Sequence, residues 1–115
     1  MSHLSELIER YTVAWNERDV ATFTSMVTDG CIRHDPGRTT TVSLRENEQR
    51  FLAAHEAMPG LHLTNAEMWE HGDDIITVCY AATHAGGSIA GIEVFRFDGD
   101  RVAEVWNAPP GEGTW

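Results

Sequence analysis

Hydrophobic residues recur along the first third of the chain at intervals of three and four, the spacing of an α-helix that buries one face. This spacing predicts an amphipathic helix over residues 3–17, with the buried stripe Leu4, Leu7, Ile8, Tyr11, Ala14 and Trp15. Asp19 is a suitable N-cap for a second helix that carries Val20, Phe23 and Val27 inward and stops near Gly30. Two helices are therefore expected before the first strand.

The next segment predicts a short strand and a third helix. Residues 31–35 form the expected strand, which Pro36-Gly37 closes, and residues 36–43 form the expected loop. Ser43 and Glu46 have the spacing of a capping box, and Pro59-Gly60 ends the helix that follows. The inward stripe of this helix is expected to be Leu44, Glu48, Phe51, Leu52, His55 and Met58.

From residue 61 onward the pattern alternates with the period of a β-strand. Four consecutive antiparallel strands are expected, over residues 61–71, 74–85, 88–97 and 101–107. Asp98-Gly99 predicts a type I′ hairpin, which fixes the register of the last pair. Alternation then places Gly91, Glu93, Phe95 and Phe97 on one face, and Ile92, Val94 and Arg96 on the other.

Helices followed by a meander of strands predict an α+β domain. We expect a cone-shaped α+β barrel, in which three N-terminal helices pack on a curved, mainly antiparallel sheet and leave a conical pocket. Residues 1–107 are expected to form this single cone-fold domain. Residues 108–115 are expected to be a flexible C-terminal tail, unless Trp115 docks.

The overall charge narrows the choice of partners. A net charge of −10 disfavours nucleic acid and anionic membrane surfaces as partners. The sequence has no apolar run of transmembrane length and no signal-peptide pattern at its start, which indicates a cytoplasmic protein. Cys31 and Cys79 are then expected to be buried thiols, and no histidine pair has a metal-ligand spacing, so no metal site is expected.

Glu93 is the first indication of chemistry. A carboxyl group on the face of Phe95 and Phe97 lies either at the edge of a core or in the wall of an apolar cavity, where desolvation raises its pKa. A structural alternative is a salt bridge from Glu93 to Arg33 or Arg101. Arg96 lies on the opposite face, where we expect it to pair with Glu104 or to serve a subunit interface.

Three sequence phrases carry a resemblance to a known family: residues 11–19 (Tyr-Thr-Val-Ala-Trp-Asn-Glu-Arg-Asp), residues 34–37 (His-Asp-Pro-Gly) and residues 93–99 (Glu-Val-Phe-Arg-Phe-Asp-Gly). With the predicted order of elements, they resemble the nuclear-transport-factor-2-like superfamily. That superfamily includes the ketosteroid isomerases and the SnoaL-like polyketide cyclases, and the resemblance spans nearly the whole chain.

The resemblance to the ketosteroid isomerases implies a catalytic role for Tyr11, Asp35 and Glu93. Tyr11 matches the tyrosine that donates a hydrogen bond to the substrate oxygen, Asp35 the general base, and Glu93 the protonated aspartate of the oxyanion hole. Two residues depart from the pattern: Glu93 is one methylene longer, and Arg33 stands where the family has an apolar side chain. The SnoaL-like cyclases often have His-Trp-Asp where this chain has Val-Trp-Asn at residues 105–107.

Each candidate also has a structural alternative. Tyr11 is equally compatible with a core position, and Asp35 with ordinary turn chemistry before Pro-Gly. If the alternation runs the other way, His34 faces inward and becomes the base. Residues expected to contact the substrate are Trp15, His34, Trp69, Tyr80, His84, Phe95 and Asn107.

The expected function is proton abstraction α to a carbonyl of an apolar, steroid-like or polyketide-like molecule, with stabilisation of the enolate and no cofactor. The ketosteroid isomerases keep a carboxylic acid neutral in an apolar site, so this mechanism is what the resemblance implies. The alternatives are a cyclase, dehydratase or hydrolase that uses His34 or His84 with Asp35, or a non-catalytic module for ligand binding or dimerisation. Proteins that resemble this family usually pair through the convex face of the sheet, so a homodimer is also expected.

Overall fold

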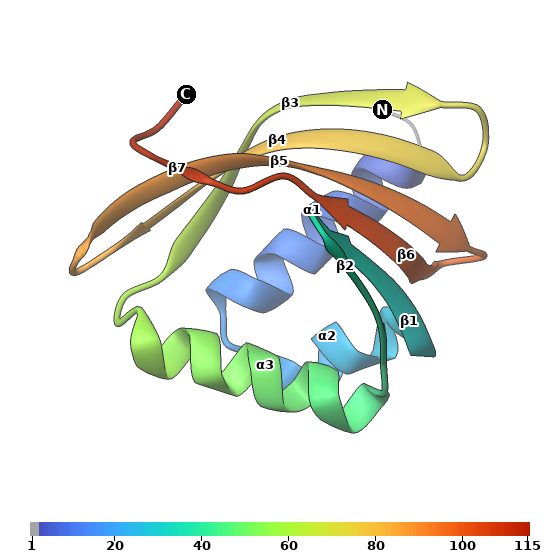
Figure 1. Ribbon diagram of the computed structural model, residues 1–115, viewed down its shortest axis with the longest axis horizontal. Helices are drawn as coiled ribbons and strands as arrows, with labels where there is room; N and C mark the ends of the chain where they lie inside the picture. Colours follow the sequence, from blue (N-terminus) through green and yellow to red (C-terminus); the bar gives the residue numbers. More distant parts are fainter. Residues whose placement is uncertain (1–2) are drawn as a thin grey trace.

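A single curved sheet arches over three helices, which cover its concave side (Figure 1). The computed structural model describes residues 3–115, so residues 1 and 2 of the expected domain lie outside the described part. The strand order is β2-β1-β6-β5-β4-β3, with β7 paired to β5. β1 and β6 run parallel, whereas the other paired strands run antiparallel. The expected α+β fold class is confirmed, and the sheet is open rather than closed into a barrel.

The elements follow one another in the order α-α-β-β-α-β-β-β-β-β. Their bounds are α1 His3–Asn16, α2 Val20–Ser25, β1 Val27–Asp35, β2 Arg38–Val42, α3 Leu44–Ala57, β3 His62–His71, β4 Ile75–His84, β5 Gly87–Asp98, β6 Arg101–Asn107 and β7 Gly111–Glu112.

The first and third helices form where the periodicity predicts them. α1 buries Leu4, Leu7, Ile8 and Ala14 against the sheet and α2. α3 begins with both bonds of the predicted capping box, since the Glu46 amide donates to the Ser43 hydroxyl and the Ser43 amide donates to the Glu46 carboxylate. These local signals need no tertiary context, so the sequence is enough to predict them.

The buried face of α3 differs from the predicted stripe. Leu52 is 50% exposed and Glu48 is also exposed, whereas Asn47, Phe51 and His55 are buried. The helix is therefore turned so that Asn47 and Phe51, four residues apart, face the sheet.

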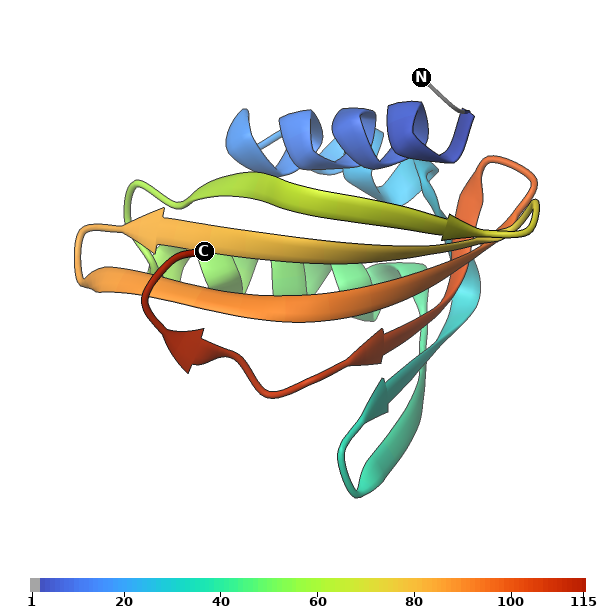
Figure 2. The same cartoon turned by 90° about the horizontal axis from the view of Figure 1, so that it is seen from above.

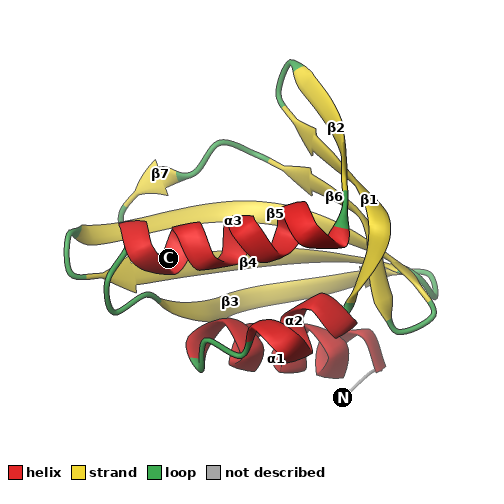
Figure 3. Cartoon of the chain, turned by 90° about the horizontal axis from the view of Figure 1, so that it is seen from below, coloured by secondary structure: helices red, strands yellow, loops and turns green. Residues whose placement is uncertain are grey.

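The segment between α2 and α3 contains more strand than predicted. α2 ends at Ser25 instead of continuing towards Gly30, because β1 already begins at Val27 and pairs with β6. The expected loop at residues 36–43 contains β2, which pairs with β1 from Asp35↔Arg38 to Cys31↔Val42. Pro36-Gly37 is thus a two-residue hairpin loop, with Gly37 at a φ of +79°. Figure 3 shows this hairpin extending beyond the helices at one end of the sheet.

The four later strands lie within one residue of the predicted bounds. Their last hairpin has Gly99 and Asp100 in its loop, with Asp98 paired to Arg101. Gly99 has a φ of +61°, and Asp100 does not have a positive φ. The predicted type I′ turn is therefore wrong, because that turn needs a positive φ at both central residues.

Register shifts interrupt the strand pairing at three places in the sheet. One lies between Val27 and Ile32 in the pairing of β1 with β6. The other two lie between Asn65 and Glu67 in β3, and between Arg96 and Phe97 in the pairing of β5 with β6, with one extra residue at each. Extra residues of this kind bend a strand and increase its twist. They leave Ala66 and Ala103 unpaired, so Asn65 and Met68 both face the concave side although they are three residues apart.

Residues 108–115, expected as a flexible tail, lie along the sheet (Figure 2). Within this segment β7 pairs with β5 through Ile89↔Glu112 and Ala90↔Gly111. The Trp115 indole donates a hydrogen bond of 2.7 Å to the carbonyl oxygen of Tyr80, although its ring remains mostly exposed. The segment therefore contributes to one edge of the concave side.

Candidate functional site

A cavity of about 290 Å³ lies between the concave face of the sheet and the three helices. Its walls are mostly apolar and aromatic, as in most small-molecule sites. Polar groups gather in one part of the wall: Tyr11, Arg33, Arg50, Tyr80, Glu93 and Asn107. The apolar lining includes Ile8, Trp15, Phe23, Phe51, Ala54, Met58, Leu61, Leu63, Val78, Ile89, Phe95 and Pro110.

The strand register aligns the polar wall. Glu93 pairs with Val78 on β4 and with Asn107 on β6, so the three side chains form one row on the concave face. The neighbouring row contains Phe95, Val105 and Arg33. The predicted alternation in β5 is confirmed, because Gly91, Phe95 and Phe97 are buried and Glu93 faces the cavity with them.

Glu93 is the carboxyl group of the cavity wall. Its side chain keeps 22% of its surface accessible, and an Arg33 guanidinium nitrogen lies 4.0 Å from one of its oxygens. Burial raises the pKa of Glu93, and the cations of Arg33 and Arg50 oppose this shift without cancelling it. The salt bridge to Arg33 considered from the sequence is therefore present at the limit of an ion-pair distance.

Tyr11 reaches the cavity from α1. Its ring centroid lies 5.6 Å from that of Phe23 and 5.5 Å from that of Phe95, so aromatic packing fixes the phenol in place. Burial raises the pKa of Tyr11, and the charge of Glu93 raises it further. Tyr11 thus remains a hydrogen-bond donor at any physiological pH.

Asp35 faces the concave side of β1, as Arg33 does, but it lies outside the cavity lining. Its carboxylate is 3.3 Å from the Arg33 Nε atom and accepts a hydrogen bond of 3.2 Å from Asn107. Together with Arg33, Arg38 and Arg50 it lines a second hollow next to the cavity. One guanidinium, that of Arg33, therefore stands between the two carboxyl groups.

His34 lies on the opposite face of the sheet. Its ring stacks on Trp106 with the centroids 5.0 Å apart, and its Nε2 atom is 2.5 Å from a carboxylate oxygen of Glu104. Arg96 donates a hydrogen bond of 2.9 Å to the same carboxylate. The alternation thus runs in the direction that brings Asp35, and not His34, to the concave side; the predicted Arg96–Glu104 pair is confirmed.

The remaining predicted substrate contacts fall into two groups. Trp15, Tyr80, Phe95 and Asn107 line the cavity. Trp69 is 50% exposed and is not part of the cavity lining, and the His84 ring accepts a hydrogen bond from the Gly86 amide in the turn between β4 and β5. The structure therefore gathers four of these seven residues around the cavity.

Two other residues of the phrase at positions 11–19 stabilise the scaffold. The Asn16 side chain donates to the carbonyl oxygen of Leu63 at 3.0 Å and accepts from its amide at 2.7 Å, which joins the end of α1 to β3. The Asp19 carboxylate accepts hydrogen bonds from the amide and the hydroxyl of Thr22, which caps α2. This arrangement fixes the place of Tyr11 relative to the sheet.

The sequence reasoning missed Arg50 and Asn65. Arg50 follows Asn47 by three residues on α3 and donates a hydrogen bond of 3.1 Å to its side-chain oxygen. Helical spacing from Phe51 was the available signal, but the predicted inward stripe contained Phe51 without Asn47. The Asn65 side chain donates to the Thr12 hydroxyl at 2.9 Å, and no sequence signal revealed it because the irregularity in β3 changes which residues face inward.

Residues 3–115 contain no group of three or more histidine, cysteine, aspartate or glutamate side chains arranged to hold a metal ion. In the same part of the chain, no helix is long and apolar enough to cross a membrane. The polar groups that line the cavity are carboxyl, guanidinium, phenol, hydroxyl and amide groups.

Solved structures share this fold at low sequence identity. An uncharacterised cystatin-fold protein from Novosphingobium aromaticivorans is 22% identical, with a TM-score of 0.78 over 93% of this chain and 97% of its own. IdmH of Streptomyces antibioticus, proposed to be a polyketide cyclase, is 16% identical, with a TM-score of 0.78 and coverages of 92% and 91%. A protein from Kribbella flavida, proposed to be a ketosteroid isomerase, is 15% identical, with a TM-score of 0.76 and coverages of 96% and 78%.

These likenesses show the fold, which hosts several activities. No curated protein matches the chain. The family model described as a SnoaL-like domain matches residues 8–105, from the middle of α1 to a point two residues before the end of β6. The chain therefore belongs to the SnoaL-like domain family.

Proposed function

We propose that the protein is a small-molecule enzyme that moves a proton α to the carbonyl of an apolar substrate bound in the cavity. The observation that carries this proposal is the Glu93 carboxyl in an aromatic wall, next to the Tyr11 phenol, with a pKa raised by burial. A protonated carboxyl group and a phenol are both hydrogen-bond donors, and burial favours the protonated form of Glu93. Two donors of this kind stabilise an oxygen on which negative charge develops.

In this mechanism Asp35 takes the proton from the α-carbon. The electron pair of the broken C–H bond forms a C=C bond, and the carbonyl π-electrons move onto the oxygen, which Tyr11 and Glu93 hold by hydrogen bonds. Asp35 then returns the proton to another carbon, which gives the isomer. Its contacts with Arg33 and Asn107 hold the carboxylate next to the cavity, where a substrate that reaches the second hollow would meet it.

The test is the isomerisation of a β,γ-unsaturated ketone, followed by the absorbance of the conjugated product. Tyr11→Phe, Asp35→Asn and Glu93→Gln are each expected to lower kcat by about 10²–10⁴-fold, the range for one acid–base or oxyanion group. Leu52→Ala, an exposed position on α3 outside the cavity lining, is the matched control and should keep the wild-type rate. Wild-type rates in both Tyr11→Phe and Asp35→Asn would refute the proposal.

The Arg33 bridge favours hydrolysis as a second candidate function. Asp35 contacts Arg33 and Asn107, whereas burial raises the pKa of Glu93, and two carboxyl groups in unlike environments can divide the roles of base and acid. Asp35 would take a proton from water, the water oxygen would bond to an electrophilic carbon, and Glu93 would protonate the leaving oxygen. Incubation of an apolar ester or epoxide in ¹⁸O-water distinguishes this reaction, because only hydrolysis incorporates one labelled oxygen.

We also propose that the protein forms a homodimer through the convex face of the sheet. One row of directly paired residues crosses five strands on this face: Trp69, Thr77, Val94, Trp106 and His34. Trp69, Ile92 and Trp106 on this face are exposed by 50%, 38% and 37%. Large exposed apolar side chains in one area are typical of protein–protein contacts.

A further inference from the structure

Arg33 and Arg50 connect the cavity with the neighbouring hollow. Both side chains line the cavity, and both also line the second hollow, which is open to solvent. Arg33 comes from β1 and Arg50 from α3, so a strand and a helix bring two guanidinium groups to the same part of the wall. This wall is cationic although the whole chain has a net charge of −10.

The charges in this region do not balance within the protein. Arg33 has Asp35 as its partner at 3.3 Å and Glu93 at 4.0 Å. Arg50 donates to the neutral amide oxygen of Asn47, and among residues 3–115 no carboxylate oxygen lies within 4.0 Å of its guanidinium. Arg33 thus has carboxyl partners, whereas the Arg50 guanidinium faces the hollow without one among the described residues, and its positive charge is left for a bound anion.

The environment of Arg50 is compatible with this assignment. Partial burial and the nearby Arg33 cation lower the pKa of Arg50, and the charges of Tyr11, Glu93 and Asp35 oppose this shift without cancelling it. The Arg50 side chain nevertheless remains accessible from the hollow. An anion placed between the two guanidinium groups would relieve their repulsion and accept charge-assisted hydrogen bonds from both.

We propose that Arg33 and Arg50 form an anion subsite that binds the carboxylate of an apolar, ring-containing acid whose body fills the cavity. This inference rests on the proposed function of the same cavity and specifies its substrate class. A single carboxylate matches the single positive charge, whereas a phosphate dianion exceeds it.

The cavity also limits the body of this ligand. Trp15, Phe23 and Phe51 give an aromatic lining, with ring centroids 4.4 Å apart for Trp15 and Phe51 and 4.8 Å apart for Phe23 and Phe51. A volume of about 290 Å³ is at the lower end of the range for ligand pockets, which is roughly 300–1,000 Å³. The preferred ligand is therefore an acid with one or two rings rather than a large polycyclic molecule.

The experiment compares the binding of 2-naphthoate with that of its neutral amide at pH 7, followed by calorimetry and by quenching of tryptophan fluorescence. The wild-type protein is expected to bind the acid about 10-fold more tightly than the amide, as one charged hydrogen-bonded group would give. Arg50→Gln should lose this preference and keep its affinity for the amide. Arg50→Lys, which keeps the charge and loses the planar fork, should retain part of it.

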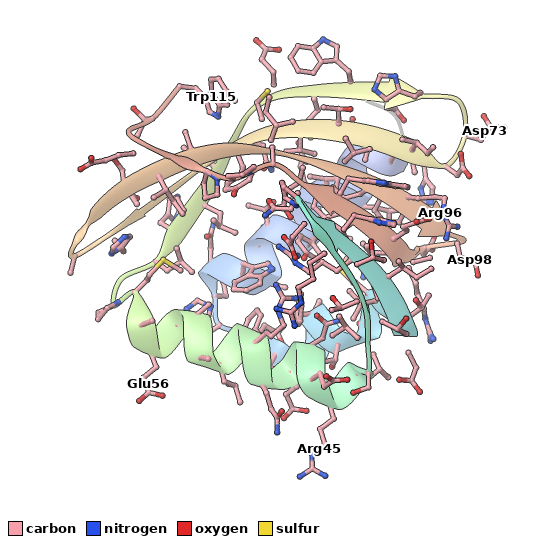
Figure 4. All side chains as sticks on the ribbon, in the orientation of Figure 1. Arg45, Glu56, Asp73, Arg96, Asp98 and Trp115 are labelled. Carbon is pink, nitrogen blue, oxygen red and sulfur yellow. The ribbon has the colours of Figure 1, made fainter. Side chains whose placement is uncertain are left out.

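Arg45→Gln is the matched control. Arg45 lies on the same helix, is exposed and points away from the body of the molecule (Figure 4), so it should leave the preference unchanged. Three results would each refute the anion subsite. The wild-type protein could bind acid and amide equally, it could bind neither, or the preference for the acid could survive Arg50→Gln. Circular dichroism and the urea midpoint establish that the variants are folded.

The binding experiment is independent of the proposed reaction. Tyr11→Phe should abolish isomerisation and keep the preference for the acid, because the phenol is not part of the guanidinium pair. A protein that prefers the acid but isomerises no ketone would support the anion subsite and refute the reaction. A protein that isomerises a ketone but binds acid and amide equally would support the reaction and refute the subsite.

Discussion

Tyr80 covers Gly91 on the neighbouring strand, and its phenol fills the space that a side chain at position 91 would need. A Cβ atom on Gly91 would lie 2.7 Å from the Tyr80 hydroxyl oxygen and 2.9 Å from the ring carbon that bears it. The two residues are directly paired in the register of β4 and β5. A glycine at this position therefore lets a cavity-lining ring lie flat against the strand.

Gly91→Ala is expected to push Tyr80 into the cavity. Overpacking of this kind destabilises proteins by about 1–3 kcal/mol, and the displaced ring also occupies volume that a ligand would use. The urea midpoint of unfolding and the affinity for 2-naphthoate should therefore both decrease. Gly111→Ala is the control, since no atom lies within 4 Å of a Cβ at that position and its φ is not in the left-handed region. An unchanged affinity in Gly91→Ala would contradict the proposed position of Tyr80.

Glu93→Gln is expected to increase stability at neutral pH. Because the folded-state pKa of Glu93 is raised by burial, the folded protein binds this proton more tightly than the unfolded chain does. The associated stability is fully present below the unfolded pKa and is lost as the pH rises through the raised folded value. Glutamine stays neutral and avoids that loss, so the free energy of unfolding should fall less between acid and neutral pH in the variant.

The measurement is urea unfolding of both proteins across that pH interval. Glu56→Gln on the exposed side of α3 (Figure 4) is the matched control and should follow the wild-type pH profile. If the Glu93→Gln and wild-type profiles are parallel, the carboxyl group of Glu93 is not held in its neutral form.

Both tyrosines of the chain are expected to resist ionisation in the folded protein. Burial raises the pKa of Tyr80 from 10.0 to about 12, and the pKa of Tyr11 is raised further. A folded sample between pH 10 and 11 should therefore show little phenolate absorbance, whereas the chain unfolded in urea should show the signal of two ordinary tyrosines. Stability should decrease over the same interval, because the unfolded chain loses these protons first.

Substitutions can assign each of the two titrations to one tyrosine. Tyr80→Phe should remove the earlier of the two folded-state transitions, and Tyr11→Phe the later one. A folded wild-type protein that titrates near pH 10 would show that neither phenol is shielded.

Ile92→Lys is expected to convert a dimer into a monomer. Ile92 is 38% exposed on the convex face, next to the row that contains Trp69 and Trp106, and a buried lysine at an interface is strongly unfavourable. Light scattering at micromolar concentration measures the mass. Leu52→Lys is the control, because Leu52 is 50% exposed on α3, away from the sheet surface. A monomeric wild-type protein would rule out this interface.

Local signals in the sequence were sufficient for much of this fold. The stripe of α1, the capping box at Ser43 and the alternation around Glu93 depend only on neighbouring residues, and each appears in the structure. The β1–β2 hairpin could not be found in this way, because Arg38–Thr41 is polar and its strand character depends on pairing with β1. Strand propensity is more dependent on context than helix propensity.

The candidate site was predictable only in part, because some of its residues are placed by pairing between distant strands. Alternation and the family resemblance identified Tyr11 and Glu93 as neighbours of one cavity, but alternation alone left the choice between His34 and Asp35 open. The pairing of β1 with β6 decides it, since His34 lies next to Trp106 and Asp35 next to Asn107. Arg50 escaped notice because the turn of α3 about its own axis depends on packing that the sequence pattern does not specify.

Residues 108–115, which follow β6, form a segment of this scaffold that can be replaced. Pro110 lines one side of the cavity. The surrounding segment is held to the sheet by β7, by hydrogen bonds from the Ala108 and Gly113 amides to β5, and by the Trp115 indole. Grafting other sequences after Asn107 would change the length and shape of the molecules admitted, while the carboxyl and guanidinium groups stay where they are. Variants of this one domain with different C-terminal segments would then select ligands of different sizes.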